Sequence, residues 1–366
     1  MEMPLNTSAP GIDANDTLTE SFDPLDEIKP STGIFKLVNV IIAWTIFIIG
    51  TFGIIGNILN LIVFAKMGFP ETIHMSYAAM AVSDIGSIFT TMWTSFNSFT
   101  TVVKDLFARY GIKTDTTRLV SLTGVWPHFA FSRITALLTA WISIERCLCV
   151  MFPTKVRIMI TAWVTKVVLA SIYIFGACPV VTRYVGLKTD MSFSPRSNFT
   201  ILRFYFNEEN SISALNRLAF VLYGAVYPLA SWFLVAICAA FLIVTLRQSV
   251  AWRSENVQAA SGETASNGER KNTGTHREKR VTKTVVIIAC IFAFCSLPVS
   301  VTILVSMFER EYSAKGSLRL IFRTNSFISM LFSEINSSIN IIVYVVTGSK
   351  FRDALLGLFS TKRARD

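Results

Sequence analysis

Seven segments of the sequence are apolar over about the 20 residues that a helix needs to cross the hydrocarbon core of a membrane. They comprise residues 37–65, 73–100, 119–151, 160–185, 218–246, 283–308 and 321–346. Composition supports this interpretation, since 16% of the residues are charged, whereas soluble domains carry about 25%. The mean hydropathy is +0.51. The sequence therefore predicts an all-α fold, a bundle of seven transmembrane helices.

Two of these segments carry an acidic residue. Asp84 lies in the second segment and Glu334 in the seventh. A charged side chain at the centre of a membrane helix costs about 2.5–3.5 kcal/mol on insertion scales. We therefore expect both helices to turn their polar faces toward the interior of the bundle.

Three glycosylation sequons indicate which side of the membrane each connection occupies. Asn6 and Asn15 lie in an acidic tail that spans residues 1–36, and Asn198 lies between the fourth and fifth segments. With seven crossings these two regions share one side, which we interpret as extracellular. Basic residues concentrate in the connections on the opposite side, in agreement with the positive-inside rule. The sequence thus predicts a plasma-membrane protein with its N-terminus outside.

Two regions on the cytoplasmic side have their own patterns. Residues 248–280 are rich in Ser, Gly, Asn, Thr, Glu and Lys without apolar periodicity, so we expect a disordered loop there. Within residues 347–366, Phe351, Leu355 and Leu358 recur at helical spacing beside basic residues. This pattern predicts a short amphipathic helix that lies on the inner membrane surface, with lipid as its partner.

The charge and the cysteines exclude other classes. A net charge of +10 does not indicate binding to nucleic acid, because the basic residues fall in short runs between apolar segments and form no continuous face. All six cysteines lie within the spans or at their cytoplasmic ends, so no extracellular disulfide is expected. No cluster of cysteine or histidine has the spacing of a zinc site.

The third segment ends in Glu145-Arg146-Cys147, which places a carboxylate and a guanidinium side by side after a long apolar run. Two interpretations of this pair are open. The arginine extends to the membrane surface beside an acidic neighbour, or the pair has a functional role at the end of the bundle.

Short motifs occur in a fixed order along the segments. They are Gly56-Asn57, Ala81-Val82-Ser83-Asp84, Glu145-Arg146-Cys147, Pro228, Phe292 with Cys295-Ser296-Leu297-Pro298, and Asn340-Ile341-Ile342-Val343-Tyr344. With these motifs the chain resembles the rhodopsin-like (class A) G-protein-coupled receptors over nearly its whole length. It is similar to divergent members such as invertebrate chemosensory and neuropeptide-like receptors. The resemblance implies a receptor that binds an extracellular ligand and activates a heterotrimeric G protein.

The resemblance also implies roles for residues at matching positions. Arg146 is expected to contact the G protein after activation and to be held at rest by Glu278, in competition with Glu145. Tyr344 is expected to turn inward on activation, and Asn340 belongs to the same seventh-helix motif. These residues form the expected coupling site.

A second set of positions matches the family's buried sodium site. It consists of Asp84, Thr135, Asn336 and Asn340. Their oxygens suit a hard cation such as sodium. The alternative is a water-filled polar network that joins three helices. Apart from this sodium ion, no cofactor is expected.

The extracellular half departs from the family pattern. Ser121 replaces the cysteine that ties the third helix to the second outer loop, Ser296 replaces an aromatic residue in the sixth helix, and Ile341 replaces the seventh-helix proline. His128 stands where amine receptors carry an aspartate, and Glu334 stands where opsins carry the lysine that binds retinal. We therefore expect neither an amine ligand nor retinal.

An aromatic pocket with one cation and one anion remains in the upper bundle. It is formed by Trp126, His128, Arg133, Tyr223, Tyr227 and Glu334. Arg133 has three candidate partners: Glu334, an anionic group of the ligand, and polar groups of the core. We expect the ligand to be a neuropeptide or a small chemosensory molecule.

Proteins of other classes place polar groups inside membranes as well. A secondary transporter or a channel is the alternative function, but a transporter is expected to show internal repeats with broken helices in matched halves. An intramembrane enzyme needs paired catalytic groups, for which Asp84 and Glu334 are the acidic candidates. The ordered motifs favour a receptor, which is not an enzyme.

Overall fold

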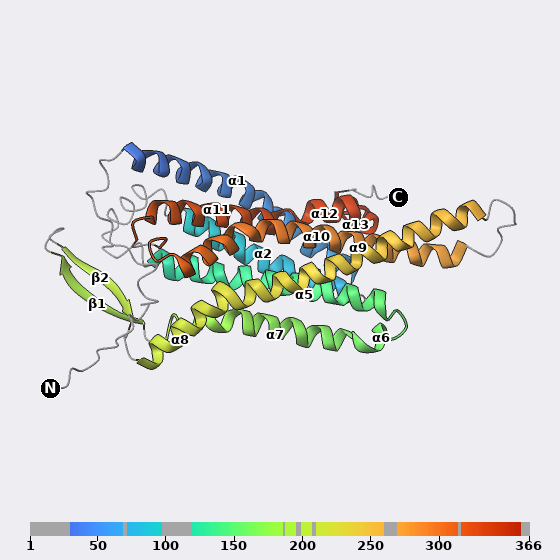
Figure 1. Cartoon of the computed structure of the whole chain (residues 1–366), viewed down its shortest axis with the longest axis horizontal. Coiled ribbons are helices and arrows are strands. Elements are labelled where there is room, and N and C mark those ends of the chain that lie inside the picture. Colours follow the sequence, from blue (N-terminus) through green and yellow to red (C-terminus); the bar gives the residue numbers. More distant parts are fainter. Residues whose placement is uncertain are drawn as a thin grey trace, which may run out of the picture.

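The helices of the chain lie side by side in one elongated bundle (Figure 1). The structure, a computed structural model, describes residues 30–68, 72–96, 119–185, 187–194, 199–206, 210–259, 269–313 and 316–359. The predicted glycosylation sites Asn6, Asn15 and Asn198 lie outside the described residues.

The described chain contains ten α-helices in the bundle and its connections, two π-helical segments, one β-hairpin and one terminal α-helix. In chain order, they are α1 (Pro30–Met67), α2 (Thr72–Phe96), η2 (Ser121–Val125), α5 (Trp126–Met151), α6 (Val156–Met159), α7 (Ala162–Val181), β1 (Leu187–Ser194), β2 (Phe199–Phe206), α8 (Asn210–Val221), η3 (Leu222–Val226), α9 (Tyr227–Ala259), α10 (Glu269–Phe308), α11 (Arg319–Ser338), α12 (Asn340–Thr347) and α13 (Ser349–Phe359).

Six helical stretches of the described chain are long and apolar enough to cross a membrane. They are Gly33–Met67, Ser121–Met151, Ala162–Val181, Ala214–Thr245, Thr282–Phe308 and Arg319–Thr347. The seventh helix of the bundle is α2, whose 25 residues span about 37 Å at 1.5 Å per residue. It is less apolar because it carries Asp84 and many hydroxyl groups. The predicted bundle of transmembrane helices is confirmed.

The interior of the bundle is polar at its centre, whereas large apolar side chains cover much of its outside. Asp84 and Glu334 are both fully buried, with 0% of their surface exposed. In contrast, outward-facing residues such as Trp44, Phe52 and Phe294 are more than half exposed. α2 lies in the centre of this arrangement, since it packs against α1, α5, α7 and α11. The predicted inward orientation of the two acids is confirmed.

Two of the spans contain a π-helical turn just before a proline. η2 precedes Pro127, the second residue of α5, and η3 precedes Pro228, the second residue of α9. A proline has no backbone N–H and its ring clashes with the carbonyl four residues earlier. A wider π turn relieves that clash by shifting the hydrogen-bond register. These turns therefore follow from the prolines and reshape the same end of both helices.

The last span is broken although it lacks the expected proline. α11 ends at Ser338 and α12 begins at Asn340, with Ile339 between them at φ −79° and ψ −16°. Ile341 stands where the family's proline is expected and cannot produce the break by itself. A hydrogen bond from the Asn340 side chain to α2, described below, lies at the same place.

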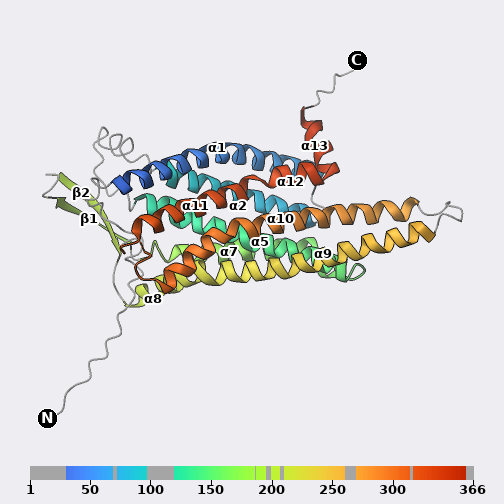
Figure 2. The same cartoon turned by 45° about the horizontal axis from the view of Figure 1, so that its top comes forward.

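The two ends of the bundle carry different structures (Figure 2). At one end, here called the hairpin end, β1 and β2 pair antiparallel from Leu187 opposite Phe206 to Ser194 opposite Phe199. At the other, here called the α13 end, α13 turns away from the bundle axis. Phe351 of α13 is buried, and Leu355 and Leu358 pack partly against the same core. The predicted short helix after the last span is confirmed, whereas the hairpin was not predicted.

The predicted disordered loop is wrong for part of its length. α9 continues to Ala259 and α10 begins at Glu269, so residues 248–259 and 269–280 are helical, and 260–268 lie outside the described residues. Absence of apolar periodicity excludes a packed face, but Glu, Arg, Lys and Ala are good helix formers. A helix that is already nucleated in the membrane extends through them at little cost.

Candidate functional site

A buried carboxylate at the centre of the bundle joins three helices. The Thr135 hydroxyl of α5 donates to Asp84 Oδ1 at 2.9 Å, and the Asn340 amide of α12 donates to Asp84 Oδ2 at 2.8 Å. Thr135 also approaches Ser83 Oγ at 3.0 Å, and Ser83 donates to the Phe131 carbonyl at 2.9 Å. Each carboxylate oxygen thus accepts a hydrogen bond from a different helix, which compensates in part for its removal from water.

The donor set around Asp84 differs from the predicted one in one residue. Three of the four predicted residues, Asp84, Thr135 and Asn340, are in direct contact. Asn336 forms no described hydrogen bond with them, and Ser337 of the next position lies beside the carboxylate instead. One residue corresponds to about 100° of helical rotation, so the shift moves the polar contribution of α11 to a different face. The role of Asn336 as a sodium ligand stays a prediction.

These residues fit a small hard cation in chemistry. Each oxygen of Asp84 has a second lone pair besides the one that accepts a hydrogen bond, and the Thr135 hydroxyl oxygen also has acceptor capacity. Carboxylate and hydroxyl oxygens are the ligands that hard cations prefer. The same contacts also make a complete polar network without an ion.

A second carboxylate lies at the α13 end. Glu145 is completely buried and accepts hydrogen bonds from the hydroxyls of Thr72 and, at 3.2 Å, Ser76, both on α2. Arg146 Nη2 lies 3.3 Å from Glu145 Oε1, and 14% of the arginine side chain is exposed. The arginine therefore does not extend freely to the membrane surface. It is held by a carboxylate that α2 fixes in place.

Glu278, the other expected partner of Arg146, lies in α10, but its side chain is outside the described residues. The predicted contact between Glu278 and Arg146 therefore remains a hypothesis.

Tyr344 lies within an aromatic cluster next to this pair. Its ring centroid is 4.9 Å from Tyr77, 5.3 Å from Phe64 and 5.4 Å from Phe351. The hydroxyl groups of Tyr344 and Tyr77 are buried, and neither has a hydrogen-bond partner within the described part of the chain. A buried hydroxyl without a partner is costly.

At the hairpin end, His128 is tied to α2. Its Nδ1 lies 2.8 Å from Thr91 Oγ1 and 3.5 Å from Ser87 Oγ. The Thr91 hydroxyl has a single hydrogen, which it donates to the Ser87 carbonyl at 2.8 Å. His128 Nδ1 must therefore be the donor in the contact with Thr91. His128 is part of the helix packing rather than an open ligand contact.

The two predicted pocket tyrosines also bond to a neighbouring helix. The Tyr223 hydroxyl donates to the Gly176 carbonyl at 2.8 Å, and the Tyr227 hydroxyl donates to the Phe175 carbonyl at 3.0 Å. Both acceptors belong to α7. Tyr223 is buried beside Trp126, whereas Tyr227 is half-buried. The Tyr227 ring also lies 6.0 Å from the Tyr223 ring and packs against the cluster that contains Trp126. The role of these residues in ligand binding stays a prediction.

Arg133 and Glu334 lie on different sides of the bundle and form no ion pair among the described residues. Arg133 is buried near Tyr223, whereas the Glu334 carboxylate lies against Gly50 of α1 and near Met92 of α2. Arg133 Nε and both Glu334 carboxylate oxygens have no hydrogen-bond partner in the described part of the chain. The first candidate partner of Arg133, Glu334, is thereby excluded in this conformation.

Sequence reasoning missed one residue at this end. Arg183, near the end of the fourth predicted segment, is only 2% exposed, and its guanidinium carbon lies 3.9 Å from the centroid of the Trp126 ring. Its Nε and Nη2 are buried, with no acceptor among the residues that the structure describes. The sequence signal was its position directly after an apolar span, beside Tyr184, where an amphipathic side chain packs along the bundle.

The fold and its polar clusters define a seven-helix membrane receptor, with a buried acid at the centre and a glutamate–arginine pair at one end. The family model described as "7 transmembrane receptor (rhodopsin family)" matches residues 56–344, which is more than half of the chain. The chain therefore belongs to the rhodopsin family of G-protein-coupled receptors. Proteins of this family are not enzymes.

A solved structure supports the same fold. The crystal structure of squid rhodopsin matches with a TM-score of 0.61 and 17% sequence identity, and the alignment covers 88% of this chain and 86% of that chain. This likeness concerns the fold and says nothing of the ligand. No match was found among curated proteins.

Proposed function

We propose that the protein is a plasma-membrane receptor that binds an extracellular ligand near the hairpin end and activates a heterotrimeric G protein at the α13 end. The N-terminus then lies outside. Basic residues at the α13 end, such as Lys155, Lys350 and Arg352, support this orientation through the positive-inside rule.

The observation that carries the proposal is the buried pair of Glu145 and Arg146. A carboxylate with no exposed surface accepts bonds from two hydroxyls of α2 and from the arginine. Release of Arg146 breaks a charge-assisted bond, which is stronger than a neutral one. Two arrangements of the pair, held and released, give the α13 end a physical basis for switching.

A ligand screen tests this proposal. Cells that express the full chain with a promiscuous G protein are exposed to panels of peptides and of small chemosensory molecules. A response that disappears in Arg146→Gln and persists in Lys155→Gln, at equal surface expression, is the expected result. Ion or solute flux through the purified protein without guanine-nucleotide exchange would instead support the alternative of a channel or transporter.

For the ligand we propose a neuropeptide or a small chemosensory molecule that carries a carboxylate. Two buried guanidinium groups support this choice, since Arg133 and Arg183 both have N–H groups without an acceptor in the described chain. A carboxylate accepts from a guanidinium in a bidentate geometry. A ligand that supplies this acceptor compensates for a desolvated donor that is otherwise costly.

Matched ligand panels test the carboxylate. Each active peptide or acid is compared with its amide or methyl ester. We expect the free acid to be at least about tenfold more potent, and the difference to disappear in Arg133→Gln but not in Arg310→Gln, an exposed arginine at the same end. Equal potency of acid and amide rules out the carboxylate while leaving the receptor proposal intact.

We further propose that Asp84, Thr135 and Asn340 hold a sodium ion. The chemistry of the donor set supports this choice. Sodium would supply at this place a positive charge that neutralises the Asp84 carboxylate.

A further inference from the structure

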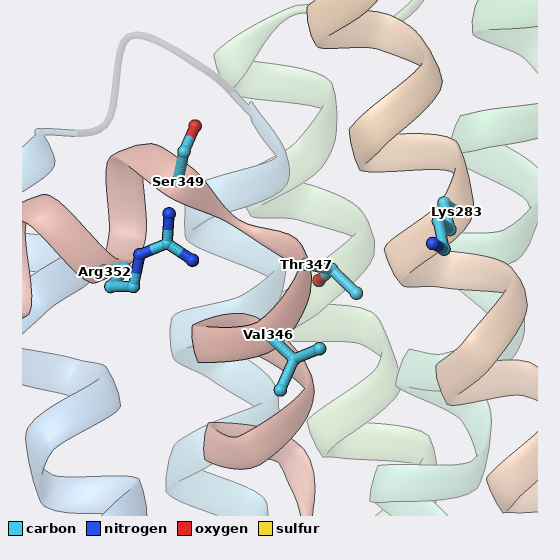
Figure 3. A pocket seen from close by; sticks show the side chains of 5 residues that line it. All are labelled: Lys283, Val346, Thr347, Ser349 and Arg352. Atoms are coloured by element: carbon cyan, nitrogen blue, oxygen red, sulfur yellow. The ribbon is translucent and has the colours of Figure 1, made fainter.

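A small cleft opens at the α13 end between the last helices. It has a volume of about 230 Å³ and is lined by Lys283 of α10, Val346 and Thr347 of α12, and Ser349 and Arg352 of α13. Figure 3 shows Thr347 between Lys283 on one side and Arg352 on the other. Pockets for drug-sized ligands measure about 300–1,000 Å³. This cleft therefore suits a single small group rather than a whole molecule.

The charge of the cleft is positive, and no residue in the described part of the chain forms an ion pair with its two cations, Lys283 and Arg352. The nearest acid along the chain is Asp353, which follows Arg352 in α13 and does not line the cleft. Two cations on different helices that face one cleft repel each other. An anion placed between them removes that repulsion.

The polar atoms of the cleft suit an anion with several oxygen atoms. The Thr347 hydroxyl donates its single hydrogen to the Val343 carbonyl at 2.6 Å, so the donors that the cleft offers to an anion are the Lys283 ammonium and the Arg352 guanidinium. α13 also begins at Ser349, so the backbone N–H groups of its first turn lie at the same place, where helix geometry favours an anion. Lysine and arginine are typical ligands of a phosphate group.

The surface beside the cleft is apolar and faces outward. Val346, which lines the cleft, is 71% exposed, and Ile342, one helical turn earlier on α12, is 60% exposed. Residues four apart lie on the same face of a helix. An apolar strip thus runs from the cleft along the outside of the bundle. A ligand with a phosphate at one end and a hydrocarbon chain at the other matches both parts.

We propose that this cleft binds the phosphate monoester of an anionic membrane phospholipid, with the phosphate between Lys283 and Arg352 and an acyl chain along Val346 and Ile342. The bound lipid connects α10 with α13. Because α10 otherwise meets this region through α12 and through the Thr284–Thr347 hydroxyl contact at 2.7 Å, the lipid stabilises the present distance between these helices.

The experiment uses the full chain in nanodiscs. Binding is measured by native mass spectrometry for phosphatidic acid and phosphatidylinositol 4-phosphate, which carry a phosphate monoester, and for phosphatidylserine, which does not. We expect the monoester lipids to bind at least about fivefold more tightly. One basic residue near an anionic membrane contributes roughly fivefold in affinity. Lys283→Gln and Arg352→Gln should therefore each lose about that factor, and the double variant more than about tenfold.

Lys350→Gln is the matched control, because Lys350 is an exposed lysine of α13 that does not line the cleft. It should bind lipid within about twofold of the unchanged chain, and Lys283→Arg, which keeps the charge, should behave likewise. All variants are compared for thermal stability in phosphatidylcholine alone, so that misfolding is recognised.

Three results would overturn the proposal. The first is unchanged binding by the double variant. The second is an equal loss in Lys350→Gln, which would indicate diffuse attraction to the surface. The third is full competition by soluble glycerol 3-phosphate or inorganic phosphate at the lipid's own concentration, which would assign the cleft to a free phosphate.

Discussion

The contacts of Glu145 explain how a charged pair persists at the end of a transmembrane helix. Removing one partner from a buried ion pair is far more costly than the pair is stabilising, because a buried charge is left without compensation. Here the glutamate keeps two hydroxyl donors from α2 even when Arg146 leaves. The arginine can therefore be released without exposing an unpaired carboxylate to a dry environment.

Glu145→Gln is expected to raise basal guanine-nucleotide exchange several-fold. The amide loses the negative charge that holds Arg146, and hydrogen bonds to charged groups contribute about 1.5–3 kcal/mol. Exchange on purified G protein is measured at equal receptor concentration. Glu309→Gln, an exposed acid at the hairpin end, serves as the control. Unchanged basal exchange in Glu145→Gln would contradict the role of the pair.

Glu278→Ala tests the competing partner. If Glu278 also holds Arg146, its removal raises basal exchange, and the effect should be smaller in the Glu145→Gln background, where the arginine is already released. Additive increases in the double variant would show that the two acids do not share Arg146.

Gly50 of α1 packs directly against the buried carboxyl group of Glu334. A Cβ atom at Gly50 would overlap Glu334 Oε1 and Met92 Sδ. Gly50→Ala should therefore destabilise the protein by about 1–3 kcal/mol, as overpacking does. Gly33→Ala is the control, since nothing lies within 4 Å of its added Cβ. Thermal unfolding in nanodiscs gives the comparison, and equal midpoints for the two variants would disprove the contact.

At the scale of elements, α2 is the helix on which the rest of the bundle depends. It supplies Asp84 to α5 and α12, the hydroxyls that hold Glu145, and the Thr91 contact of His128. The break in the last span also belongs to this scale. With Ile341 in place of proline, two side-chain hydrogen bonds lie at the break: Asn340 donates to Asp84, and Asn57 of α1 donates to the Ser337 carbonyl at 2.8 Å.

Sodium dependence tests the central contacts of α2. Replacing N-methylglucamine by sodium at constant ionic strength should raise the thermal midpoint of the protein, since a ligand that binds only the folded state stabilises it. Asp84→Asn should abolish this rise. Asp190→Asn, an exposed aspartate of the hairpin, should keep it. If sodium still raises the thermal midpoint in Asp84→Asn, the ion does not bind at Asp84, and the site is a polar network without an ion.

Much of this arrangement of elements could be predicted from the sequence. The third span was expected at residues 119–151, and η2 with α5 covers Ser121–Met151, because hydropathy reports directly on membrane crossing. The inward direction of Asp84 follows from the cost of charge in lipid. The direction of Tyr227 and the burial of Arg183 could not be predicted, because they depend on α7 carbonyls and on a tryptophan that tertiary packing brings close. The hairpin could not be predicted either, because the pairing of β1 with β2 depends on where the neighbouring helices α7 and α8 end and begin.

At the scale of the whole molecule, buried hydroxyls without a partner lie beside the pair that we propose as the switch. The hydroxyls of Tyr344 and Tyr77 lie near the Glu145–Arg146 pair without a hydrogen-bond partner in the described chain. Their desolvation costs free energy in this state. A state in which Arg146 moves and the hydroxyls gain partners or water offsets that cost.

Tyr344→Phe should therefore leave the resting protein as stable as before or slightly more stable, while lowering the raised basal exchange of Glu145→Gln. Loss of an unsatisfied hydroxyl is nearly neutral, whereas loss of a bonded one is destabilising. Tyr173→Phe is the matched contrast, because the Tyr173 hydroxyl donates to the Ala79 carbonyl at 2.7 Å. A lower thermal midpoint in Tyr344→Phe than in Tyr173→Phe would argue against a second state for Tyr344.

None of the six cysteines forms a disulfide, and the hairpin is held to itself by backbone pairing between β1 and β2. Biosynthesis of this receptor therefore requires no oxidation step and no disulfide isomerase, and a strong reducing agent has no covalent bond to break at the hairpin end. The pairing of β1 with β2 therefore depends on backbone hydrogen bonds and not on a covalent cross-link.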